Sequence, residues 1–96
     1  MLRISRADSD HVTSLRLEGK LLEPWLGELR REIANVDRQL TVELDISGLS
    51  YADPAGALLL ATLENNGIRL TAASPFLRSL IAAAIADRAG VTRSRS

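Results

Sequence analysis

The chain has 96 residues, enough for one hydrophobic core, and its 12 basic and 12 acidic residues cancel. That balance argues against nucleic acid or an anionic membrane surface as a partner. Without cysteine and with a single histidine, the chain cannot form a disulfide, a thiolate metal site or a histidine cluster, so we expect no metal and no cofactor. No apolar run approaches the ~20 residues that span a membrane. The first residues lack the apolar core of a signal peptide, so we expect a cytoplasmic protein that does not span a membrane.

The N-terminal part predicts a hairpin followed by an amphipathic helix. Residues 2–6 alternate apolar and polar, and residues 11–17 form a second expected strand that residues 18–20 end. The short polar link between the two strands favours antiparallel pairing. From Glu23 to about Arg38, apolar residues recur at helical spacing on one face, which predicts a helix.

The middle of the chain predicts a strand, an exposed loop and an apolar helix. Aliphatic and β-branched residues at 41–46 predict the strand, and the Ser-Gly pair that follows is expected to end it. Asp53 stands where a helix N-cap is expected. Pro54 stands at the first helical position, where its missing N–H has no intrahelical partner. The helix from Pro54 to about Asn65 is apolar nearly all round, so it is buried on two sides or keeps an apolar face for a partner.

The C-terminal part predicts a strand and a last helix. The Asn-Asn-Gly sequence at 65–67 predicts a left-handed helix stop, and residues 68–72 predict a strand. Ser74 as N-cap and Pro75 at the first position predict the start of the third helix. The chain turns polar and basic from residue 87, so we expect a domain of residues 1–86 and a disordered basic tail of residues 87–96.

This order of elements predicts a single α/β domain. Strand–helix–strand units require right-handed crossovers between parallel strands, whereas the first two strands form a hairpin. We therefore expect a four-stranded mixed sheet with an N-terminal hairpin and about three helices mainly on one face.

The stretch LDISGL at residues 44–49, followed by Asp53, Gly56 and an aliphatic helix, resembles the STAS domain family (sulfate transporter and anti-sigma factor antagonist). The pattern of that family is an aliphatic strand, Asp, aliphatic, Ser-Gly-aliphatic, then aliphatic-Asp-Ser-Ser-Gly and an aliphatic helix. The family also has the same order of strands and helices. The chain departs from the pattern at Pro54 and Ala55, which stand where the family usually has two hydroxyl residues.

The resemblance implies a non-catalytic, protein-binding domain of the bacterial cytoplasm. In the family's anti-sigma factor antagonists, a partner kinase phosphorylates the first hydroxyl after the motif's Asp, and the ~1.5–2 added negative charges can break the interface. The matching position here is Pro54, followed by Ala55, so the phosphorylation position is lost while a binding surface can remain.

The resemblance also implies two possible kinds of partner. The first is an anti-sigma factor, or a kinase-like ATPase, in a partner-switching system that regulates transcription. The second is the ATPase of an ABC-type lipid transporter, of which the chain would be an accessory subunit. The missing hydroxyl counts against a phosphorylation-regulated version of the first role and does not decide between the two.

The expected partner-binding surface combines the loop before the second long helix with the exposed face of that helix. A rigid loop beside an apolar helix face suits a protein–protein interface. The alternative is that all the leucines of this helix are core residues, and the sequence does not say which of them faces inward. The candidate residues are Ser50, Tyr51, Ala52, Asp53, Pro54, Ala55, Leu58, Leu59 and Thr62.

Enzyme chemistry finds little support in the sequence. Asp45 and Asp53 could be imagined as a carboxylate pair, but we expect Asp45 to bind loop amides near Ser47, and Asp53 to cap a helix. His11 is expected to be an ordinary surface residue. A nucleotide- or anion-binding module is a weaker alternative, because Pro54 removes one donor from the helix N-terminus and Asp53 repels anions.

Overall fold

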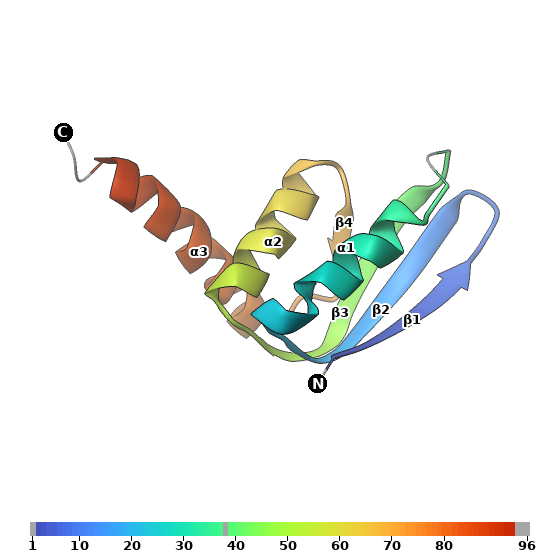
Figure 1. The fold of residues 1–96 in the computed structure, drawn as a ribbon, viewed down its shortest axis with the longest axis horizontal. Helices are drawn as coiled ribbons and strands as arrows, with labels where there is room; N and C mark the ends of the chain where they lie inside the picture. Colours follow the sequence, from blue (N-terminus) through green and yellow to red (C-terminus); the bar gives the residue numbers. More distant parts are fainter. Residues whose placement is uncertain (1, 38, 94–96) are drawn as a thin grey trace.

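The computed structural model describes the backbone of residues 2–37 and 39–93, and side chains as far as residue 87. Within these residues, four strands form one sheet in the order β1-β2-β3-β4 (Figure 1). β1 (Leu2–Asp8) pairs antiparallel with β2 (Val12–Leu21). β3 (Thr41–Ala52) is parallel to β2, and β4 (Arg69–Thr71) is parallel to β3. The predicted mixed sheet with an N-terminal hairpin is confirmed.

The helices gather on one side of the sheet, as predicted. A 3₁₀ turn, η1 (Glu23–Trp25), leads into α1 (Leu26–Ala34), and β3 leads into α2 (Pro54–Asn65). Figure 1 shows α1 and α2 over the same face of the sheet. The first part of α3 (Pro75–Arg93) lies beside α2, and the later part of α3 diverges from α2. No helix among the described residues is long and apolar enough to cross a membrane.

The core lies between the sheet and the helices. Alternate residues of a strand point to opposite faces, so the apolar residues of β2 and β3 line one face while polar residues occupy the other. Each fully buried leucine stabilises the fold by roughly 1.5–3 kcal/mol. The apolar strand residues with no exposed surface are Leu15, Leu17, Leu21, Leu44 and Ile46. The most buried leucines that the helices pack onto them are Leu29, Leu60 and Leu77.

The prediction that strands end at residues 18–20 and at residues 47–48 is wrong, because β2 and β3 continue side by side beyond these residues. Their pairing shifts register twice in this region, and such irregularities increase the twist of a strand without ending it. A Cβ on Gly48 would lie 2.8 Å from Cγ of Glu18, so this glycine marks a close approach of two strands. Residues 50–52, expected in an exposed loop, are the end of β3.

The predicted caps of two helices are confirmed. α2 begins at Pro54 and ends at Asn65 as expected. Gly67 follows with a φ of 96°, the left-handed conformation that a glycine adopts without strain. At the start of α3, the hydroxyl oxygen of Ser74 accepts a hydrogen bond from the N–H of Leu77 at 3.1 Å.

Two helices differ in length from the prediction. α1 ends at Ala34, because the chain turns there toward β3. The predicted end at about Arg38 falls on a residue outside the described ones. α3 continues to Arg93, so residues 87–93 of the predicted tail are helical, and residues 94–96 lie outside the described chain.

Candidate functional site

Asp53 connects the start of α2 to η1, the turn that leads into α1. Its Oδ1 accepts a hydrogen bond from the N–H of Gly56 at 2.7 Å, the predicted N-cap interaction, and its Oδ2 accepts one from the N–H of Glu23 at 2.8 Å. Its own N–H donates to the carbonyl oxygen of Leu21 at 3.1 Å. One residue therefore joins the ends of β2 and β3 to both helices, which makes this corner of the domain rigid.

Gly56 allows α2 to pack directly against the end of β2. A Cβ at this position would lie 2.5 Å from the carbonyl oxygen of Leu21 and 3.1 Å from Cγ of the same residue. Backbone atoms cannot move aside as a flexible side chain can, so no larger residue fits here. The Asp-x-x-Gly spacing of the sequence thus has a physical cause, with Asp53 as the cap and Gly56 as the point of closest approach.

Most of the predicted partner-binding residues lie on the surface around this corner. Ala52 and Leu59 do not, because only 1% and 7% of their surfaces are exposed. These two are core residues, so the core alternative for the leucines of α2 holds for Leu59. The exposed residues are Ser50, Tyr51, Pro54 and Thr62, and the half-buried ones are Asp53, Ala55 and Leu58.

Two of the hydroxyl groups near this surface have backbone partners. The hydroxyl of Ser50 donates to the carbonyl oxygen of Gly19 at 3.1 Å, across the β2–β3 pair. The hydroxyl of Thr62 donates to the carbonyl oxygen of Leu58 at 2.9 Å, one turn earlier in α2. Both hydroxyls therefore form hydrogen bonds within the domain.

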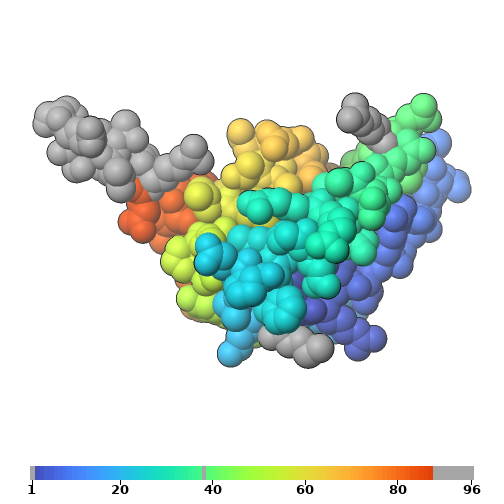
Figure 2. Space-filling model, in the orientation of Figure 1, coloured from blue at the N-terminus to red at the C-terminus, as the bar shows by residue number. Residues whose placement is uncertain are grey.

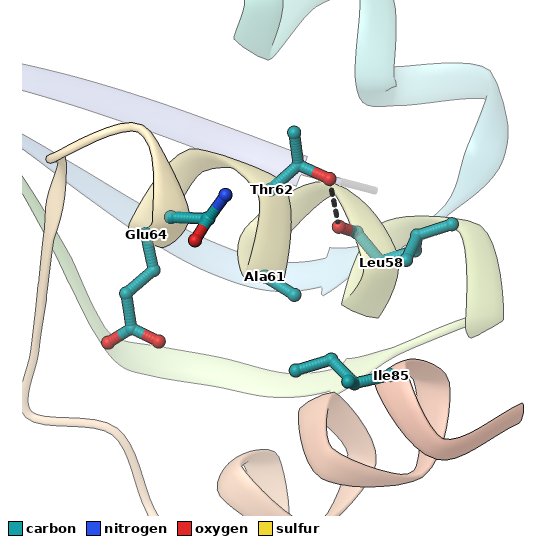
Figure 3. A pocket seen from close by; sticks show the side chains of 6 residues that line it. Leu58, Ala61, Thr62, Glu64 and Ile85 are labelled. Carbon is teal, nitrogen blue, oxygen red and sulfur yellow. Dashed lines mark hydrogen bonds between the residues drawn. The ribbon is translucent and has the colours of Figure 1, made fainter. Parts of the chain in front are cut away.

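Two hollows flank the exposed ridge of α2, and Leu58 and Thr62 line both. The first, of about 530 Å³, lies between α2 and α3, and Figure 3 shows Leu58, Thr62 and Ile85 around it. The second, of about 390 Å³, lies between α1 and α2 and is bordered by Gly27 and Arg30. Figure 2 shows the surface of α1 and α2 on this side of the molecule. α2 is thus a partly apolar ridge with a depression on each side.

Asp45 lies on the other face of the sheet. Its carboxylate accepts a hydrogen bond from the N–H of Ser47 at 2.9 Å, as predicted. The backbone and the side chain of Ser47, and then the charge of Arg16, hold the pKa of Asp45 below its ordinary value. Asp45 and Asp53 therefore bind different backbone amides. Among the described residues, no group of three or more His, Cys, Asp or Glu could hold a metal ion.

A charged pair joins the end of α2 to α3. Both guanidinium nitrogens of Arg78 donate to the Glu64 carboxylate, each at 3.0 Å. These hydrogen bonds lower the pKa of Glu64 and raise that of Arg78. The pair fixes one end of the hollow between the two helices.

The fold and the Asp-capped helix define the class of this domain, which is the STAS fold. A solved structure that the chain resembles is that of the anti-sigma factor antagonist SpoIIAA in its unphosphorylated form. The TM-score is 0.60, the identity is 20%, and the match covers 83% of this chain and 80% of that one. No protein-family model and no curated protein matches the sequence. The likeness confirms the predicted fold.

Sequence reasoning missed the α1 side of this surface. The bond from Glu23 to Asp53 and the hollow beside Gly27 arise where separate elements pack together, and no local pattern marks such a place. One signal was present in the sequence. Gly27 lies inside a predicted helix, where glycine is unfavourable unless packing or function requires it.

Proposed function

We propose that this chain is a non-catalytic regulator of the anti-sigma factor antagonist type, which acts in the bacterial cytoplasm without a phosphorylation switch of its own. The observation that carries the proposal is the start of α2. It has the Asp cap and the close-packed glycine of the motif, but Pro54 and Ala55 stand where the motif has hydroxyls. On this proposal the surface around the start of α2 binds the partner, and the hydroxyl whose phosphorylation would release the partner is missing.

The neighbouring hydroxyls do not replace the missing ones. Ser50 lies on β3 and its hydroxyl is bonded to the carbonyl oxygen of Gly19. Tyr51 is also on β3, before the cap residue rather than after it. A kinase that recognises a hydroxyl at the first turn of α2 finds only Pro54 and Ala55 there. The partner is therefore bound regardless of its kinase activity.

The rigidity of the corner favours binding. Pro54 has a fixed φ, and Asp53 holds the turn from both sides through the amides of Gly56 and Glu23. A surface that is already ordered loses less conformational entropy when a partner binds. The ridge of α2 can thus serve as a preformed contact, with Leu58 as its apolar centre.

Anion binding is disfavoured at the same place. The N–H of Gly56, which an anion at the start of α2 would need, already donates to the carboxylate of Asp53. That carboxylate also repels a phosphate. The start of α2 therefore gives little support to a role as a nucleotide-binding module.

Affinity capture from the host lysate, followed by mass spectrometry, tests the proposal. The wild-type domain and Leu58→Glu serve as matched baits, because Leu58 is half-buried and its replacement leaves the core intact. We expect the wild-type bait to enrich an anti-sigma factor or a histidine-kinase-like ATPase, and the variant to lose it. Recovery of an ABC ATPase with its permease would instead make the chain a transporter subunit and overturn the proposal.

A further inference from the structure

The hollow between α1 and α2 has the form of a groove for one helix. β2 and β3 are parallel, so α1 and α2, which follow them, run in the same direction (Figure 1). The side formed by η1 and α1 presents Glu23, Gly27 and Arg30. The side formed by α2 presents Ala55, Leu58 and Thr62, which share one face at helical spacing. The groove therefore extends along both helices, from the Glu23 end to the Arg30 end.

Gly27 keeps this groove open. A Cβ at position 27 would have nothing within 4 Å, unlike one at Gly56. Glycine also destabilises a helix relative to alanine, because it gives up more conformational freedom. Folding thus gains nothing from a glycine here. What the glycine provides is access to the apolar floor formed by Leu26 and Leu59, whose surfaces are 5% and 7% exposed.

The two ends of the groove carry opposite charges. Glu23 and Arg30 are both exposed, and neither forms an ion pair with another residue in the described part of the chain. They are seven residues apart in the sequence, which corresponds to about two helical turns or roughly 10 Å. Between them, Leu26, Leu58 and Leu59 contribute apolar side chains to the lining of the groove.

We propose that this groove binds one amphipathic helix of the protein partner. That helix carries a basic residue opposite Glu23, an acidic residue opposite Arg30 about two turns away, and a leucine-sized side chain that lies over Gly27. The inference rests on the proposed function for the existence of a protein partner. The choice of occupant follows from charge complementarity and from the open position at Gly27.

Three stapled helical peptides serve as probes. They share a central leucine and differ only in two charged positions seven residues apart, which hold Lys and Glu, two Lys, or two Glu. Titration into the ¹⁵N-labelled full chain is followed by NMR. We expect the Lys/Glu peptide to bind roughly fivefold more tightly than the other two, because each of those replaces one exposed ion pair by a contact between like charges. The Lys/Glu peptide should also shift the amides of Gly27 and Thr62. In Arg30→Glu, the two-Lys peptide should bind best.

Gly27→Leu is the decisive variant, because it fills the groove without replacing a core side chain. We expect it to fold at least as stably as the wild type in urea and to lose peptide binding at least tenfold. Ile85→Glu is the matched control, since it alters only the hollow between α2 and α3 and should leave binding unchanged. Equal binding of all three peptides, or unchanged binding to Gly27→Leu, would overturn the inference.

Two further outcomes separate this inference from the proposed function. If Leu58→Glu loses the captured partner while Gly27→Leu retains it, the proposed function stands and the groove is not used. Sedimentation equilibrium tests the other occupant. A wild-type dimer that Gly27→Leu converts to a monomer would assign the groove to a second copy of this chain and overturn the proposal of a partner helix.

Discussion

The carboxylate of Asp53 accepts the N–H of Glu23 at 2.8 Å while its other oxygen caps α2. The two residues lie at the start of different helices, at the ends of neighbouring parallel strands. This bond holds the two helices that border the α1–α2 groove in a fixed relation. The position of the candidate binding surface therefore depends on one side chain.

Substitution of Asp53 should separate its two roles. Asp53→Ala loses both interactions, and we expect a loss of about 1–2 kcal/mol in the free energy of unfolding. Asp53→Asn keeps an oxygen for the Gly56 N–H, but its amide nitrogen cannot accept from Glu23, so its stability should be intermediate. Urea denaturation of the three proteins measures this order. Equal stability of Asp53→Asn and the wild type would show that the bond to Glu23 contributes nothing.

Replacement by alanine should have opposite effects on stability at two glycines that lie in helices. Gly56→Ala places a Cβ 2.5 Å from the carbonyl oxygen of Leu21, so we expect a loss of roughly 2 kcal/mol or more. Gly27→Ala meets nothing within 4 Å and should gain about 0.5–1 kcal/mol from the better helix propensity. Thermal denaturation of both variants tests the pair. A stable Gly56→Ala would contradict the close packing of α2 on β2.

Leu58 and Leu59 are neighbours in α2 with different roles. Leu59 is 7% exposed, so Leu59→Glu buries an unpaired charge and should lose several kcal/mol, enough to unfold a small domain. Leu58 is half-buried on the ridge, and Leu58→Glu should fold with less than about 1 kcal/mol of loss, as most surface changes do. Circular dichroism with urea distinguishes them. If Leu58→Glu also unfolds, the ridge belongs to the core and the binding surface is misplaced.

The sequence predicted those parts of the fold that depend on local signals. The caps at Asp53 and Ser74 were found because a capping side chain bonds an amide within the next three residues. The order of strands and helices predicted the mixed sheet for a similar reason, since connection lengths restrict the possible topologies. The amide near Asp45 was also expected, and that bond joins residues two positions apart.

The rest depends on contacts between distant parts of the chain. The Ser-Gly pair at 47–48 predicts the end of a strand. β3 nevertheless continues, because β2 stays paired with it through two register shifts. The choice between Leu58 and Leu59 could not be made, because α2 is apolar nearly all round and its neighbours decide which side is buried. The hydrogen bond between Glu23 and Asp53 and the groove at Gly27 also arise from contacts between segments that are distant in the sequence.

The lack of a hydroxyl at Pro54 and Ala55 predicts that a kinase leaves the wild-type domain unmodified and that a restored hydroxyl is phosphorylated. Incubation of the wild-type domain with an anti-sigma kinase and ATP should leave Ser50 and Tyr51 unmodified, as judged by phosphopeptide mass spectrometry. Pro54→Ser restores a hydroxyl at an exposed position of the first turn and should become phosphorylated. Ala55→Gly is a control without a hydroxyl. Phosphate on Ser50 or Tyr51 of the wild type would show that the switch has moved rather than disappeared.

The Glu64–Arg78 pair predicts a pH dependence of stability. The hydrogen bonds from Arg78 lower the pKa of Glu64 below its ordinary value of 4.5, so the folded state holds this proton less tightly than the unfolded state. The stabilisation is therefore present above about pH 4.5 and lost as the pH falls through the lowered pKa. Both side chains are more than a third exposed, so the effect is roughly 0.2–1 kcal/mol.

Glu64→Gln provides the control for this pair. Its free energy of unfolding should change less than that of the wild type between about pH 5 and pH 3, because the titrating group is gone. Urea denaturation at both pH values measures the difference. An identical pH dependence in the two proteins would mean that the ion pair does not contribute to folding.

The most direct test of the central claim is isothermal titration of the captured ATPase with the wild-type domain and with Leu58→Glu, each with and without prior incubation with ATP. The account predicts that the wild type binds with the same affinity before and after this incubation, because no hydroxyl follows Asp53, and that Leu58→Glu binds at least tenfold more weakly. A wild-type affinity that falls after incubation with ATP would contradict the loss of the switch. Equal binding of the two domains would contradict the placement of the interface on α2.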